Sequence, residues 1–504
     1  MSPHVRQVKT ASGATAVQVV VSRKRGHRVV EHMGSAHDPV TLALLRAAGE
    51  QRVEALRLQD QLPWEPSTPA PPTRGAVPIT SCRLGVLWDT LNQVWALLGL
   101  DQASGHDRVF RKVALARVIE ATSKLDAIRV LGDVGVPSFS YATLKRRLPG
   151  WASPGFGDAL SGACAARAAL GPAALVLYDV TTLATASDKE DDFRKVGYSK
   201  IRSVDPQVTV GLLTDQTGFP LMVEAFEGNK AEKTTMIPVV ERFVRAHGIA
   251  GVTVVADAGM MSAANMDKVV DLGWTFIVGS RLADVPAPVR AWDQAHPDEA
   301  PPNGLVLHQP DPDHQGWTLV YQYRAKRAAR GLRGIDAQVA RAEQAVAGKT
   351  PIKRNRFVVV SRADARVNRE LEAKARQLAG WRSYLTNLDA EPGWVIDRYH
   401  DLWRIEHAFR ISKHDLDANP VYHRLETSIK AHLNVVFAGL AVARHIEAAT
   451  GWSIDRFVKT MRHYKTITLD VAGHAVAAQD PIPDDIRAIL TLATQPKPPE
   501  KGTK

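Results

Sequence analysis

Three acidic residues of the 504-residue chain stand where carboxylates could bind divalent cations: Asp179, Asp257 and Glu406. Asp179 interrupts the apolar, β-branched run AALVLYDVTTLAT (173–185), and burying a carboxylate there is costly unless it is paired or binds a cation. Asp257 ends the apolar run of GVTVVADAG (251–259). Ligands of open α/β sheets bind at the carboxyl ends of strands. A single aspartate at a strand end is more often structural, but two on neighbouring strands favour a functional site.

Glu406 belongs to a row of polar residues in the sequence RYHDLWRIEHAFRISKHDL. Tyr399, Glu406 and Lys413 follow one another at intervals of seven residues, which is about two turns of helix at roughly 3.6 residues each. We therefore expect one helix, Val395–Leu416, to carry all three on the stripe that packs on the sheet. The alternative is an ordinary ion pair on the helix surface between Glu406 and Arg410.

These residue types suit phosphoryl transfer assisted by two Mg²⁺ or Mn²⁺ ions about 4 Å apart in one active site. Mg²⁺ prefers oxygen ligands and keeps some of its waters, so a few carboxylates suffice and no His or Cys cluster is needed. We expect Asp179 to bridge both ions, and Asp257 and Glu406 to complete one each. Lys413 and Tyr399 would hold a DNA phosphate beside them, with assistance from Arg410.

The elements around these acids predict an α/β fold. From residue 172 to 280 the pattern is strand, strand, strand, helix, strand, helix, strand, the order of an RNase H-like mixed sheet with flanking helices. Residues 281–390 break this alternation and predict a β-rich insertion domain. Residues 391–450 predict the second part of the catalytic domain, including the helix that bears Glu406.

The remainder of the chain predicts further segments. Residues 1–61 predict a small β/α segment, the Pro-rich stretch 62–78 a stiff linker, and 451–504 a C-terminal region with a disordered tail. Residues 79–150 predict a mainly helical DNA-binding region. Within it, GDVGVPSFS (132–140) followed by YATLKRRL (141–148) resembles a helix-turn-helix, with Lys145, Arg146 and Arg147 as DNA contacts. An ordinary helical pair with a solvated basic end explains the pattern equally well.

The composition is compatible with a nucleic-acid partner. The formal net charge is +11, and a basic surplus favours polyanions, although charge alone does not decide the matter. The two cysteines, Cys82 and Cys164, exclude a disulfide framework and a cysteine-rich zinc site. Neither a signal peptide nor a membrane-spanning apolar stretch is found, which predicts a cytoplasmic protein, associated with the nucleoid when bound to DNA.

At these motifs the chain resembles the insertion-sequence DDE transposases, whose third acid lies in a Tyr-x2-Arg-x3-Glu-x6-Lys signature. YDVTTL matches the segment of the first acid, VVADAGMMS that of the second, and YHDLWRIEHAFRISK that of the third. VGYSKIRSVDPQVTVGLL, EGNKAEKTT and VVEHMGSAHDP are similar to the family as well. The chain departs from the signature at Leu402, where the family has arginine, and Arg410 is the better substitute because Arg404 points to another side of the helix.

The resemblance implies an enzyme that moves its own insertion sequence by cut-and-paste transposition. It would bind double-stranded DNA at the terminal inverted repeats, nick each end and join the freed ends to target DNA. Pairing two ends implies a homodimer in the synaptic complex. A simple RNase H-like nuclease and an inactive or domesticated transposase that only binds DNA remain the alternatives.

Overall fold

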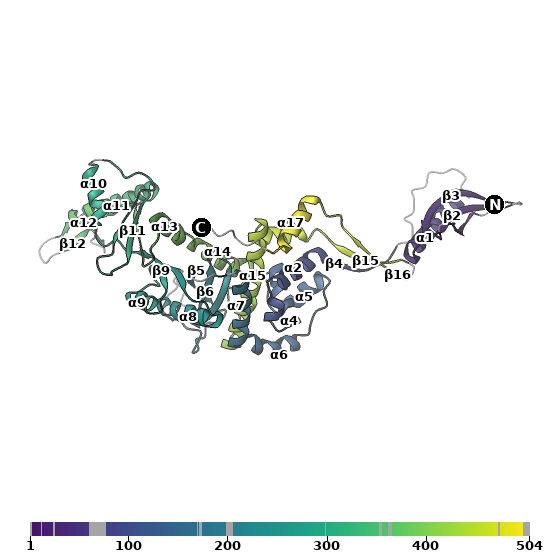
Figure 1. Ribbon diagram of the computed structural model, residues 1–504, viewed down its shortest axis with the longest axis horizontal. Helices are drawn as coiled ribbons and strands as arrows, with labels where there is room; N and C mark the ends of the chain where they lie inside the picture. The colour runs from purple at the N-terminus through teal and green to yellow at the C-terminus, as the bar shows by residue number, and fades with distance from the viewer. Residues whose placement is uncertain are drawn as a thin grey trace. The chain divides into compact units, whose positions relative to one another are not determined.

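The computed structural model describes residues 3–11, 13–23, 26–59, 77–168, 170, 174–197, 205–297, 299–351, 355–360, 365–471 and 474–496. The predicted linker lies outside these residues except for its last two positions, as does most of the predicted tail, 497–504. The chain forms two compact units (Figure 1). Their residues are Met1–Asn92, Ile128–Ser138 and Asp455–Leu492 in the first, and Gln93–Ala127, Phe139–Ile454 and Ala493–Lys504 in the second. The domain boundaries predicted from the sequence stay a prediction.

The first unit contains two three-stranded antiparallel sheets. One consists of β1 (Pro3–Lys9), β2 (Thr15–Arg23) and β3 (Gly26–Ala36), and α1 (Pro39–Gln59) contacts all three strands. The other has the order β16 (His474–Gln479), β15 (Thr466–Val471), β4 (Ile79–Arg83). The helices that lie mainly in this unit are α2 (Gly85–Leu97), α5 (Ala127–Asp133), α16 (Ile454–Met461) and α17 (Asp484–Thr494).

The strand β4 is one element that the sequence did not predict within residues 79–150, a segment expected to be mainly helical. Ile79–Arg83 reads ITSCR and pairs with β15, where Ile467 lies opposite Cys82. A five-residue strand whose partner is nearly the whole chain away has no local pattern by which it could be recognised.

The second unit is organised around one eight-stranded mixed sheet with the order β10-β11-β14-β9-β8-β5-β6-β7. Its strands are β5 (Ala174–Ala184), β6 (Gln207–Asp215), β7 (Pro220–Glu227), β8 (Val252–Ala256), β9 (Thr275–Ser280), β10 (Val306–Pro310), β11 (Thr318–Tyr323) and β14 (Trp381–Thr386). The neighbours β5, β6 and β7 pair antiparallel, whereas β5, β8 and β9 pair parallel. This part has the strand order expected of an RNase H-like fold, and the mixed α/β class is confirmed.

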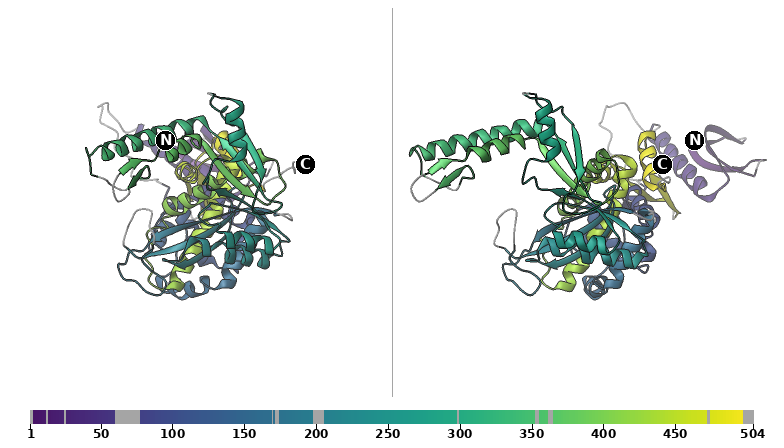
Figure 2. Two further views of the ribbon diagram at one scale, coloured as in Figure 1. Left: turned by 90° about the vertical axis from the view of Figure 1, so that its left-hand side faces the viewer. Right: turned by 60° about the vertical axis from the view of Figure 1, so that its left-hand side comes forward.

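Two strands of the region predicted as an insertion domain, β10 and β11, belong to this same sheet. β14 pairs antiparallel with β9, and β11 and β10 follow it outward. This region has two small cores, one with Val289, Tyr321 and Trp381 and another, in its outer part, with Ile335, Val339 and Phe357. That part contains the long helix α11 (Ala325–Val346), α12 (Arg369–Gln377) and the hairpin β12 (Val358–Val360)–β13 (Ala365–Val367), and Figure 2 shows it extending from the edge of the sheet.

The two faces of the sheet are covered by different helices. On one face Val176, Tyr178 and Val180 of β5 join a core with α8 (Met236–His247) and α9 (Ala263–Asp271). Side chains alternate along a strand, so Leu177, Asp179, Thr181 and Leu183 lie on the other face. That face is covered by α13 (Pro392–His400), α14 (Leu402–Arg410) and α15 (Glu426–Thr450). Asp179 therefore lies on the face covered by α13, α14 and α15.

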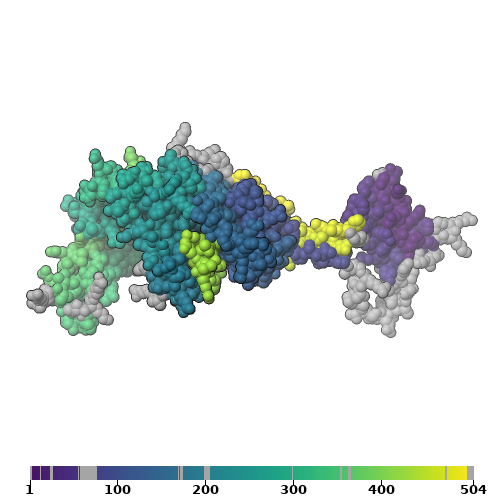
Figure 3. All heavy atoms as spheres, turned by 90° about the horizontal axis from the view of Figure 1, so that it is seen from below, coloured from purple at the N-terminus to yellow at the C-terminus, as the bar shows by residue number. Residues whose placement is uncertain are grey.

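Further helices of this unit surround α15, whose middle is buried on all sides. α6 and α7 contact it, and Figure 3 shows part of α15, in yellow-green, at the surface beside them. The second unit also contains α3 (Leu100–Ala103), α4 (Arg108–Ile119), α6 (Tyr141–Trp151), α7 (Pro154–Ala168), α10 (Ala287–Ala295) and the short 3₁₀ helix η1 (Glu232–Thr234).

Arg117 of α4 is a buried cation that anchors the segment following α14. Its guanidinium donates to the carbonyl oxygens of Leu416 at 2.5 Å, Asp417 at 3.0 Å and Thr122 at 2.7 Å. Burial lowers the pKa of Arg117 to about 10, so the group stays charged at neutral pH. Three carbonyl groups are thereby satisfied by one side chain that is only 4% exposed.

A buried cluster of basic side chains lies beyond Arg117. Lys124 Nζ is 2.6 Å from His423 Nε2 and 3.1 Å from His432 Nδ1. Burial and the neighbouring cations lower the pKa of all three, that of His423 to about 3. The imidazoles are therefore neutral at physiological pH and act as acceptors towards the lysine.

Candidate functional site

Asp179 lies on β5 and Asp257 directly follows β8, and these two strands are neighbours in the middle of the sheet. In the parallel pair β5–β8, Leu177 is the register partner of Val255. Extending this register by two residues sets Asp179 beside Asp257, the residue that follows the end of β8. Adjacent strands are separated by roughly 4.8 Å, and equal parity puts both side chains on the same face. The topology therefore brings two acids that are distant in the sequence to neighbouring positions.

Asp179 is half-buried within β5, and one of its carboxylate oxygens accepts a hydrogen bond from the amide of Val180 at 2.7 Å. Asp257 is exposed, and its Oδ1 accepts from the amide of Ala258 at 2.8 Å and from the hydroxyl of Tyr399 at 2.9 Å. Tyr399 itself is 4% exposed. Burial, reinforced by the charge of Asp257, raises the pKa of Tyr399, so its hydroxyl stays protonated and donates.

Gly279 of β9 makes this tyrosine contact possible, and sequence reasoning missed it. A Cβ at position 279 would lie 2.6 Å from the Tyr399 hydroxyl oxygen and 3.1 Å from Cζ. Only a residue without a side chain lets the ring lie flat on the strand and reach Asp257. The signal in the sequence was a glycine inside the otherwise apolar strand WTFIVGS.

Glu406 lies on α14, the helix that contacts β5. Its side chain is exposed, and no ion pair of Glu406 is found among the described residues. Arg410, the expected alternative partner, instead donates to His407 Nδ1 at 2.7 Å. Within the ranges that the structure covers, no three His, Cys, Asp or Glu side chains lie close enough to hold one ion. The three acids are thus placed on adjacent elements, two of them at neighbouring positions, without forming a compact cluster.

The helix that was expected to be continuous from Val395 to Leu416 is divided in two places. α13 ends at His400, and α14 begins after Asp401, which receives ion pairs from Arg398 and Arg404. After Arg410 the chain forms a π-helical turn, η2 (Ile411–Asp415). A π turn holds more residues than an α turn, so seven residues no longer make two turns. The expectation that Tyr399, Glu406 and Lys413 share one straight stripe is therefore wrong, although all three remain on elements covering the same face.

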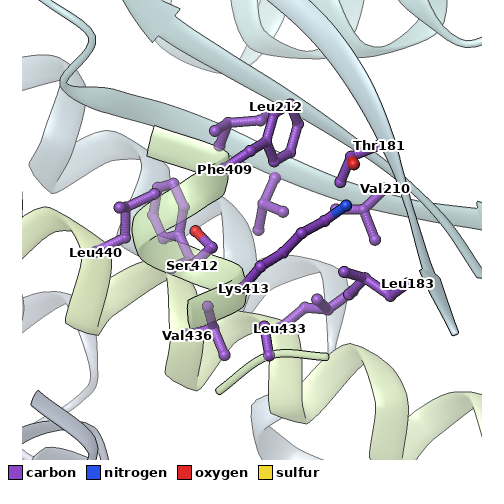
Figure 4. Close-up of a pocket in the computed structure, with 13 residues that line it drawn as sticks. Thr181, Leu183, Val210, Leu212, Phe409, Ser412, Lys413, Leu433, Val436 and Leu440 are labelled. Atoms are coloured by element: carbon purple, nitrogen blue, oxygen red, sulfur yellow. The ribbon is translucent and has the colours of Figure 1, made fainter. Parts of the chain in front are cut away.

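Lys413, on η2, lines a small, largely apolar cavity of about 30 Å³ between the helices and the sheet. Figure 4 shows its side chain reaching toward the strands, with the amino group near Thr181 and Val210. Thr181 is the next residue after Asp179 on the same face of β5. The lysine amine therefore lies near a residue that is two positions along the strand from Asp179. The aliphatic part packs against Leu183 and Leu433.

Three further predicted DNA contacts lie on α6. Lys145, Arg146 and Arg147 are all exposed, and the last two line an open groove together with residues 104–109. Leu144 and Trp151 anchor the other side of α6. The preceding helix, α5, lies mainly in the other compact unit. The helix-turn-helix assignment stays a prediction.

No helix in the described part of the chain is both long enough and apolar enough to cross a membrane.

Comparison with known proteins adds a family to this geometry. The family model described as "Transposase DDE domain" matches residues 171–440, more than half of the chain, from the start of β5 through the middle of α15. No curated protein matches. Among solved structures, the chain is similar to a piggyBac transposase in a cryo-EM synaptic complex with hairpin DNA, with 11% identity over 81% of this chain and 74% of that chain. The TM-score is 0.36, too low to support a statement about this chain. By the extent of the family match, the chain belongs to the transposases with a DDE domain.

Proposed function

We propose that this protein is a cut-and-paste transposase that cuts DNA at the ends of its own insertion sequence and joins them to a new site. The observation that carries the proposal is the β5–β8 register, because its extension by two residues would bring Asp179 beside Asp257 on the face covered by the Glu406 helix. The DDE family match supports the same chemistry, polynucleotidyl transfer. The resemblance of the motifs to insertion-sequence enzymes supports the finer assignment to terminal inverted repeats and to a dimer in the synaptic complex.

The donor set fits Mg²⁺ or Mn²⁺. Asp179, Asp257 and Glu406 offer only carboxylate oxygens, the ligands such ions prefer. Asp257 and Glu406 are exposed, so their outer oxygens are open to an ion and its waters. Two bound ions would supply activation of the attacking oxygen and stabilisation of the leaving oxygen. Closing the site around them requires α14 to carry Glu406 toward the aspartates, and the breaks on both sides of α14 are where the backbone can adjust.

The chain's own residues have defined tasks in this proposal. Tyr399 holds the Asp257 carboxylate in one orientation by donating to Oδ1. Lys413 presents its amine beside Thr181, where it can hold a DNA phosphate next to Asp179. Arg410, on the exposed side of α14, is positioned for a second phosphate contact. Lys145, Arg146 and Arg147 provide exposed charge on α6 for the flanking duplex.

The test uses the purified full chain and a duplex that carries one end of the element, taken from the DNA that flanks the gene. With Mg²⁺ or Mn²⁺ we expect cleavage at the element end, followed by joining to a plasmid target. Asp179→Asn, Asp257→Asn and Glu406→Gln should each bind the duplex like the wild type and lose cleavage by at least about a thousandfold. Asp267→Asn, an exposed acid on α9, is the matched control and should leave cleavage unchanged. Retained cleavage in any of the three variants contradicts the assignment of the acids.

A further inference from the structure

Arg324, Arg327 and Arg382 gather on the face of the sheet that carries Asp257. They lie at β11 and β14, the two strands that follow β9 outward. Gln322 is the register partner of Arg382 in the β11–β14 pair, and Val320 is that of Tyr384. Since alternate residues share a face, Arg382 and Tyr384 of β14 lie beside Gln322 of β11 and Arg324, which follows it. Tyr384 contacts the Tyr399 ring, with 4.9 Å between the centroids, so this is the face that α13 covers.

Two of the arginines, Arg382 and Arg327, are held in place by contacts other than carboxylates. The Arg382 guanidinium lies over the Tyr399 ring, 5.2 Å from its centroid. Arg327, in the first turn of α11, donates to the carbonyl oxygens of Gln322 at 3.4 Å and Gly380 at 3.2 Å. Arg324 is exposed at the start of the same helix. In the described part of the chain, no Asp or Glu lies within ion-pair distance of any of the three.

The positive charges of the three arginines repel one another and also act on the imidazole of His400. The pKa of His400 is lowered by burial and by the charges of Arg382, Arg324 and Arg327, against an opposing contribution from Asp397. His400 Nε2 lies 3.3 Å from the Tyr384 hydroxyl. Like charges held near one another raise the energy of the free protein, and a bound anion relieves the repulsion. The arrangement is thus an anion site whose polar walls are guanidinium, phenol and imidazole groups.

The position of this cluster relative to the candidate acids specifies the anion. Arg382 covers the ring whose hydroxyl holds Asp257, so one side chain separates the cluster from that carboxylate. Lys326, Arg330 and Arg333 continue the exposed positive charge along the first half of α11. A charged track of this length suits a polymer of phosphates, whereas a small free anion would use only one end of it. The planar guanidinium fork matches phosphate oxygens in bidentate geometry.

We propose that Arg324, Arg327 and Arg382 bind one backbone phosphate of the DNA strand that passes Asp257, and that the first half of α11 guides the neighbouring phosphates. The inference rests on the proposed function, because it names the contact by which that site holds its substrate. Arg382 is the central residue, since it lies between the phosphate and Tyr399. The cluster orients the strand and takes no part in the bond changes.

The test measures DNA binding in Ca²⁺ buffer, so that cleavage plays no part. The probe is a fluorescent duplex that carries one element end. Arg382→Gln should weaken binding about tenfold and lower the slope of log affinity against log salt by about one. Arg382→Lys should keep most of the slope but lose affinity, because it keeps charge without the fork. Arg341→Gln, an exposed arginine on the second half of α11, is the matched control and should bind like the wild type.

A second measurement locates the phosphate. Single methylphosphonates, which are neutral, are placed one at a time along the probe. One position should weaken the wild type about tenfold and leave Arg382→Gln without further loss, because the same contact has already been removed. An equal loss from Arg341→Gln, or additive losses at every position, would overturn the proposal. If the wild type cleaves element-end DNA but every methylphosphonate adds its loss to that of Arg382→Gln, only the arginine site is refuted. If one methylphosphonate position is non-additive but the wild type does not cleave, only the transposase assignment is refuted.

Discussion

Replacing Tyr399 with phenylalanine removes one hydroxyl and tests whether this residue positions Asp257. The ring remains, so its contact with Tyr384 and the Arg382 guanidinium above it are retained. The lost interaction is the 2.9 Å hydrogen bond to Asp257 Oδ1. In the variant this oxygen still accepts the hydrogen bond from the amide of Ala258 at 2.8 Å. Since Asp257 is exposed, water can replace the hydroxyl, and the cost in unfolding free energy should stay near or below about 1 kcal/mol.

The effect on the reaction should be larger than the effect on stability. A group that orients a metal ligand through a hydrogen bond typically changes metal affinity or activity by about 10- to 100-fold when it is removed. We therefore expect Tyr399→Phe to cleave element-end DNA about 10- to 100-fold more slowly at limiting Mg²⁺, with partial recovery at high Mg²⁺. Binding of the duplex in Ca²⁺ should change little, because the DNA contacts of neighbouring residues remain.

The assay is a titration of cleavage rate against Mg²⁺ concentration, with thermal unfolding measured in parallel. Tyr321→Phe provides the matched control. Tyr321 is also buried, at 3% exposure, but its side chain joins the core on the opposite face of the sheet. The control should keep the wild-type dependence on Mg²⁺. If Tyr399→Phe shows the wild-type rate and the wild-type dependence as well, the hydroxyl does not position Asp257 and the reasoning fails.

Three further outcomes follow from the same structure. Gly279→Ala should push the Tyr399 ring off the strand, since the new Cβ would lie 2.6 Å from its hydroxyl oxygen, and cleavage should fall about tenfold with at most about 3 kcal/mol lost in urea unfolding. Arg117→Met should lower the unfolding free energy by about 3 kcal/mol, because buried carbonyls lose their donor, and urea titration measures this. The unfolding free energy should fall as the pH drops below 6.5 toward about 3. In this range the histidines of the unfolded chain become protonated, whereas His423 and His432 of the folded chain stay neutral because their pKa values are lowered. The slope is about 1.4 kcal/mol per pH unit for each histidine, and the urea midpoint of His423→Gln should decline less steeply than that of the wild type.

The sequence predicted the part of the fold whose pattern is local. Continuous apolar runs around Asp179 and Asp257, a hairpin between β6 and β7 and an amphipathic helix at α8 were sufficient for the mixed α/β class and for the strand order from β5 to β9. What the sequence could not predict is pairing across long separations. β14 pairs with β9 about a hundred residues away, with Ser383 opposite Ser280, and nothing within either strand identifies its partner. The strands at 281–390 were therefore assigned to a separate domain.

The candidate site shows the same division. Strand patterns located the two aspartates, and the parallel register places them together. The helix period located Glu406 but not the π turn, because a change of turn leaves no mark on the spacing of apolar residues. Gly279 and Arg382 were not singled out, since their roles arise only when β9, β14 and α13 meet. Residues whose importance depends on a contact between distant strands are the ones that sequence reasoning misses.

The extension of the sheet past β9 has a mechanical consequence. One uninterrupted ladder of backbone hydrogen bonds joins β11 to β14 and β14 to β9. α11 leaves this ladder directly after β11, and Gly279, the seat of Tyr399, lies on β9. If DNA binds α11 as proposed, a displacement of that helix would reach β9, and with it Tyr399 and Asp257, through these hydrogen-bonded strands.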